Sequence, residues 1–293
     1  EVLCEVPAKM DSFMDGNMSD YLLGGVNYYI DVDEIAALEA GIITNRDLES
    51  CAERMYIKFN KSVATRDHLM MLDLIANFDW KRPISFTQPH IMQDYGIIDY
   101  ARFDGCSYAL VPIYTPYSSA RSIGYMDVDA LYPLYMGINV EGSVQKPLQF
   151  GNLADEDVYI DSFYRYNLSA SRSCENFARV AKGFVERGDM EDLRKAERLL
   201  NRGLTVLPLH RIGYSLNAVL PYVEVYYMLG EAWMAYGDSA NAERNFLNGD
   251  NLAVAFILAQ AQEVRYYEQL VSYNNFSPVI SSKLYNALYD IVD

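Results

Sequence analysis

The sequence predicts an α+β protein, with a small mixed α/β domain at residues 1–157 and an all-α, tetratricopeptide-like domain at residues 158–293. In the first part, short segments with strand periodicity alternate with short helical segments. From about Asp161 onward, helical segments follow one another without an intervening strand pattern. A chain of 293 residues is long enough to bury two separate cores.

The first domain is predicted to hold short elements with recognisable boundaries. Asp33 is a candidate N-cap for a helix at 34–40, which Gly41 would end. A further helix is expected from Asp127 or Asp129 to Met136. Alternating apolar residues predict strands at 55–59, 84–87 and 108–113, the last two in one sheet.

The stretch from Leu69 to Thr87 is the most informative part of this domain. It reads as a helix that turns sharply into a strand, with Thr65 as N-cap and Pro83 preventing the helix from passing Arg82. The apolar residues cover nearly all faces of this helix, which is typical of a buried helix.

The second domain is predicted to consist of consecutive helices. Their expected ranges are 162–187 with a possible interruption at 169–173, then 190–206, 221–236, 239–247, 251–272 and 281–291. Tetratricopeptide repeats pair two helices with large and small residues at set positions. That order is matched by Tyr226, Leu229, Gly230, Trp233, Ala242 and Phe246, and more loosely by Phe177, Val180, Ala181, Phe184, Ala196, Leu200 and Gly203.

Two repeats are too few for a free-standing array, so they should pack on the first domain or on the last helices. The concave face of such a repeat could bind a peptide, and Tyr226 and Trp233 are the candidate residues of that face. Intramolecular packing is the alternative for the same residues.

Composition excludes some functions. The net charge of -16 argues against nucleic acid as a partner and against electrostatic docking on anionic lipid. The chain contains 25 tyrosines, which are common on sugar-binding and protein-binding surfaces but also pack in helical cores. The four cysteines are widely spaced, at Cys4, Cys51, Cys106 and Cys174, and we expect mostly free, buried thiols rather than two disulfides.

Motifs for common chemistries are absent from the sequence. There is no HExxH, GxGxxG, Walker A or GxSxG pattern, so we expect no metal and no cofactor, and we assign no catalytic residue. One group of candidate ligand-binding residues remains: Asp73, Trp80, Lys81 and Arg82 could form a polar pocket with a stacking ring. Alternatively, Asp73 pairs with a nearby cation, Trp80 fills the core, and the two basic residues point to water.

The segment LMMLDLIANFDWKRPISFTQPHIMQD, at residues 69–94, resembles the soluble C-terminal part of the DUF2723 family of Bacteroidetes membrane proteins. The resemblance continues through residues 101–113, 150–161 and 175–189. Members of that family resemble membrane glycosyltransferases of the protein O-mannosyltransferase kind, with a many-spanning membrane half first. The resemblance implies a periplasmic location, and it implies that sugar transfer from a lipid-linked donor takes place in the membrane half.

Three functions follow as hypotheses. The first is a non-catalytic extracytoplasmic domain for acceptor recognition or assembly, whose partners are the membrane-spanning half of its own full-length protein and a peptide or glycan acceptor. Because the chain begins at Glu1 and not at Met, we expect it to be a piece of such a longer protein. The second is a stand-alone helical-repeat protein that binds a glycan or a peptide, and the third is a soluble hydrolase.

Overall fold

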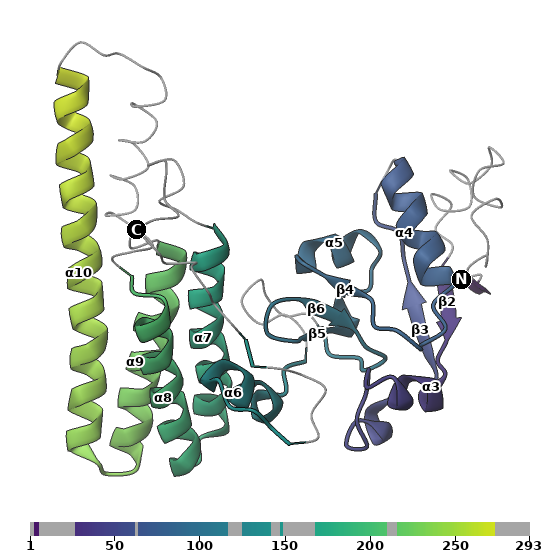
Figure 1. Ribbon diagram of the computed structural model, residues 1–293, viewed down its shortest axis with the longest axis horizontal. Coiled ribbons are helices and arrows are strands. Elements are labelled where there is room, and N and C mark those ends of the chain that lie inside the picture. Colours follow the sequence, from purple (N-terminus) through teal and green to yellow (C-terminus); the bar gives the residue numbers. More distant parts are fainter. Residues whose placement is uncertain are drawn as a thin grey trace. The chain divides into compact units, whose positions relative to one another are not determined.

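The structure is a computed structural model, and it describes residues 3–5, 27–61, 64–116, 125–141, 147–148, 168–209 and 216–272 (Figure 1). The chain divides into two compact units, Glu1–Asp127 and Val128–Asp293. The first unit holds short strands and helices, and the second holds long helices, which confirms the predicted α+β class. The boundary expected from the sequence, after Asp157, lies outside the described residues and stays a prediction.

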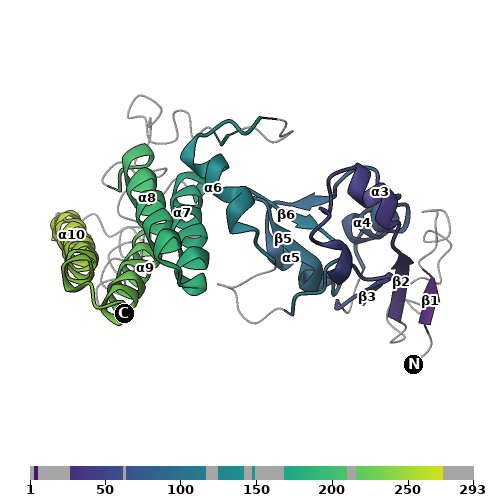
Figure 2. The ribbon, with the colours of Figure 1, turned by 90° about the horizontal axis from the view of Figure 1, so that it is seen from below.

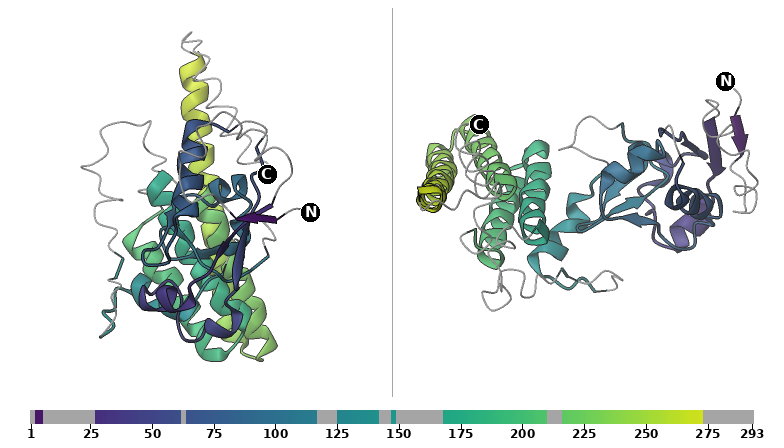
Figure 3. Two further views of the ribbon diagram at one scale, coloured as in Figure 1. Left: turned by 90° about the vertical axis from the view of Figure 1, so that its right-hand side faces the viewer. Right: turned by 90° about the horizontal axis from the view of Figure 1, so that it is seen from above.

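The first unit contains two three-stranded sheets. In one sheet the strands are β1 (Leu3–Glu5), β2 (Asn27–Asp31) and β3 (Arg54–Ile57), in that order. The β1 and β2 strands are parallel, and they lie side by side in the right-hand view of Figure 3. The β2 and β3 strands are antiparallel. As the alternation predicts, Met55 and Ile57 are buried while Tyr56 is exposed.

The second sheet has the order β4 (Ser85–Phe86), β6 (Tyr108–Leu110), β5 (Ala101–Phe103), and all its pairs are antiparallel. The prediction that the segments at 84–87 and 108–113 share a sheet is therefore confirmed. All three residues of the central strand β6 are buried, and the strand pairs with β4 on one edge and with β5 on the other. The Ala52 amide N–H donates to the carbonyl of Pro112 at 2.8 Å, which links the segment before β3 to the segment after β6.

Short helices complete the first unit. They are α3 (Glu34–Glu39), η1 (Leu48–Ser50), α4 (Arg66–Ala76), α5 (Pro89–Asp94) and η2 (Ile98–Tyr100). The Asp33 carboxylate accepts the amide N–H of Ala36 at 3.0 Å, so the predicted N-cap of α3 is confirmed. Gly41 follows α3 with φ of 69°, a conformation that glycine adopts without strain.

The helix α4 begins after Thr65, as the sequence predicts, but it is not fully buried. Only Leu72 and Ile75 lie in the core, whereas Met70 and Leu74 are 55% and 51% exposed. The expectation of a helix buried on all faces is therefore wrong. The unit is small, and one side of α4 is enough to cover the available apolar surface of its core.

The second unit consists of α6 (Val128–Met136), α7 (Leu168–Arg187), α8 (Met190–Val206), α9 (Leu216–Ala235) and α10 (Ser239–Ser272). The helix α7 packs on both α8 and α9, and α10 packs on α9 (Figure 2). The turns between α7 and α8 and between α9 and α10 contain Gly188 and Gly237, each with φ near 80°.

Glycines allow the helices to approach closely, as in tetratricopeptide repeats. A Cβ atom at Gly230 would lie 2.4 Å from the ring of Phe246, on the paired helix α10. A Cβ atom at Gly203 would lie 2.8 Å from the ring of Phe177 and 2.0 Å from the hydroxyl of Tyr222. Both contacts involve positions at which the repeat pattern expects a small residue against a large one. In each pair a glycine faces a large ring of the paired helix, so these helices pack closely at that point.

Two predicted helix boundaries are wrong. The helix α9 begins at Leu216, so Pro221 lies inside this helix and does not mark its start. The ranges 239–247 and 251–272 form one continuous helix, α10. Gly249 lies between the two predicted ranges, inside this helix, and it is buried next to the ring of Tyr227 and the Cβ atom of Tyr226. The predicted helix at 281–291 lies outside the described residues.

Candidate functional site

Trp80, the centre of the first candidate site, lies in the core of the first unit. Its side chain is 1% exposed, and its Nε1–H donates to the carbonyl oxygen of Asp31 at 2.9 Å. Its ring lies 4.4 Å from that of Phe78, measured between centroids. The backbone of Trp80 has φ of 59°, which is uncommon for a residue other than glycine. Both faces of the indole are therefore covered, and the ring offers no surface on which a ligand could stack.

The other three residues of this candidate site do not converge around Trp80. Asp73 is half-buried and accepts a hydrogen bond from the side-chain amide of Asn77 at 3.2 Å. Lys81 is exposed and pairs with the exposed Asp79 at 3.3 Å, and Arg82 is exposed as well. This arrangement follows the alternative in which the indole fills the core and the basic residues point to water.

Tyr226 and Trp233, the candidates for the repeat face, are also buried, at 3% and 1% exposure. The Nε1–H of Trp233 donates to Glu197 Oε1 at 3.0 Å. The same oxygen accepts from the side chains of Arg244 and Asn245, at 3.0 and 2.7 Å. Glu197 thus joins α8, α9 and α10 through one carboxylate. Both aromatic residues act within the repeat core rather than on its surface.

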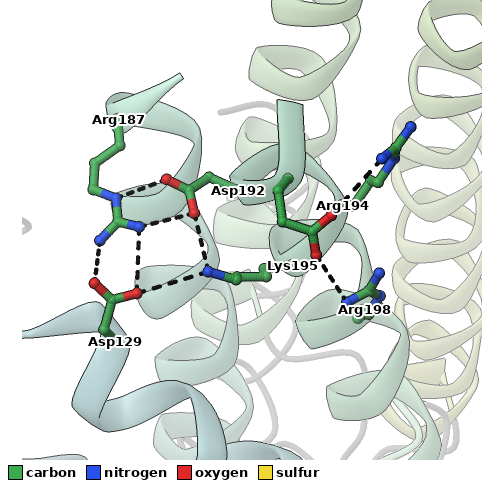
Figure 4. Close-up of polar contacts among 7 residues, drawn as sticks. Asp129, Arg187, Asp192, Arg194, Lys195 and Arg198 are labelled. Carbon is green, nitrogen blue, oxygen red and sulfur yellow. Dashed lines mark hydrogen bonds and ion pairs between the residues drawn. The ribbon is translucent and has the colours of Figure 1, made fainter. Parts of the chain in front are cut away.

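A second polar network joins α6 to the first helix pair (Figure 4). Arg187 donates to Asp192 at 2.7 and 2.8 Å and to Asp129 at 2.6 Å. Lys195 lies 3.3 Å from Asp192 and 3.8 Å from Asp129. Hydrogen bonds from the Arg187 guanidinium, with further bonds from Lys195, lower the pKa of the buried Asp192 carboxyl.

This network has no signature in the sequence, because Asp192 reads as an ordinary acidic residue in the first turn of a helix. The pairing of two carboxylates with two cations leaves the cluster neutral. All four groups contact oppositely charged partners, so we interpret the cluster as a clamp that holds α6 against α7 and α8.

The exposed surface of the second unit is most apolar along α10. Leu247, Val254 and Leu258 are separated by seven and four residues, so they lie on one face of the helix, and Ile257 lies beside them. Their exposed fractions are 56%, 54% and 59%, with 49% for Ile257. We call these four residues the α10 stripe. A terminal helix of a repeat array normally presents a polar outer face, so an apolar stripe is unusual for such a helix.

The described residues contain neither a metal-binding group of side chains nor a membrane-spanning helix. Where the structure places side chains, no group of three His, Cys, Asp or Glu residues is arranged to hold a metal ion. None of the helices within the described ranges combines the length and the apolar character needed to cross a membrane.

Comparison with known proteins gives one match. Residues 7–130 match the family model described as TMEM260-associated domain 2. The matched range covers nearly all of the first unit and less than half of the chain. No curated protein and no solved structure gives a significant match. The first unit is thus similar to a TMEM260-associated domain.

Proposed function

We propose that this chain is a non-catalytic extracytoplasmic interaction domain of a membrane glycosyltransferase-like protein. Its partner is the membrane-spanning half of its own full-length protein, where sugar transfer takes place. The match of residues 7–130 to a TMEM260-associated domain supports this assignment. The resemblance to the soluble part of the DUF2723 family that we expect from residues 69–94 lies within the same matched range and points to the same kind of protein. The domain serves assembly of the protein or recognition of its acceptor.

The observation that carries the interaction role is the α10 stripe. Four aliphatic side chains on one helix face, each about half exposed, are costly to leave in water, at about 25 cal/mol per Å² of apolar surface. An amphipathic helix of the membrane-spanning half, or a loop between its spans, would cover this surface in the helix-to-groove manner.

The proposal is tested by co-purification of the tagged chain with the membrane-spanning half, expressed separately and extracted in detergent. We expect the two pieces to co-purify, and we expect the variant with Leu247, Val254 and Leu258 all replaced by Glu to abolish the complex. These residues are more than half exposed, so the substitutions should leave the fold intact. The matched control replaces the exposed Asn201 and Arg202 of α8 by Ala and should co-purify normally.

Three results would contradict the proposal. The first is a natural gene that encodes no membrane spans together with this chain. The second is co-purification that survives the triple Glu variant. The third is loss of thermal stability in the triple Glu variant, which would indicate that residues 273–293 of the chain itself cover the stripe.

A further inference from the structure

We draw no further inference here: the strongest candidate, the exposed apolar face that Met70 and Leu74 form on α4, carries none because nothing in the structure shows what covers it.

Discussion

Replacement of Gly230 by Ala tests the close packing of the second helix pair. A Cβ atom at this position would lie 2.4, 2.6 and 2.6 Å from three atoms of the Phe246 ring. Carbon atoms in ordinary contact are about 3.5–4.0 Å apart, so α9 and α10 would have to separate locally by about 1 Å. Overpacking of this severity costs about 3 kcal/mol, and the higher helix propensity of Ala returns about 1 kcal/mol.

The expected result for Gly230→Ala is a net loss of about 2 kcal/mol in the free energy of unfolding, or about 4–8 °C in Tm. Thermal or urea unfolding followed by Trp233 fluorescence and by circular dichroism measures it. Because Phe246 provides the clash, Gly230→Ala should cost almost nothing in a background that already carries Phe246→Ala. Glu231→Ala, at the exposed neighbouring position, controls for helix propensity. A Gly230→Ala variant as stable as the parent would refute the nested packing.

Three further predictions concern other parts of the molecule. Asp192→Asn should lower stability by about 1–3 kcal/mol at pH 7, because the buried group loses its charge-assisted bonds to Arg187. The folded-state pKa of Asp192 is lowered, so the stability that this carboxylate contributes is present above about pH 4. That stability is lost as the pH falls through the folded-state pKa. The acid unfolding curves of the parent and the variant should therefore converge at low pH. Trp80→Phe should cost about 1–3 kcal/mol in urea unfolding, because the Asp31 carbonyl loses its donor. Cys174 is fully buried and burial raises its pKa to about 12, so iodoacetamide at pH 8 should label the exposed Cys106 in the native protein and Cys174 only after unfolding.

Features with a local cause could be predicted from the sequence. Asp33 caps α3 because its carboxylate reaches an amide three residues ahead, and that geometry depends on the neighbouring residues alone. The alternation of buried and exposed residues in β3 follows from strand geometry in the same way. The repeat pattern around Gly230 was predictable because the spacing of large and small residues records which helix faces touch.

Features that depend on distant residues could not be predicted. Trp80 stands between charged residues in the sequence, which left a ligand site and a core position open, and the core position depends on a bond of its indole to Asp31, 49 positions earlier. The break expected between residues 247 and 251 is absent, because α10 continues through Gly249, whose Cβ would lie 3.2 Å from the Tyr227 ring on another helix.

We propose photocrosslinking in native membranes to measure the contact between α10 and the membrane-spanning half of the full-length protein. A photoreactive amino acid at position 258 replaces Leu258, which is 59% exposed on the α10 stripe. The same amino acid at position 201, an exposed position on α8, serves as the control. We expect position 258, and not position 201, to crosslink to peptides of the membrane-spanning half. Crosslinks from position 258 only to residues 1–293, or none at all, would contradict it.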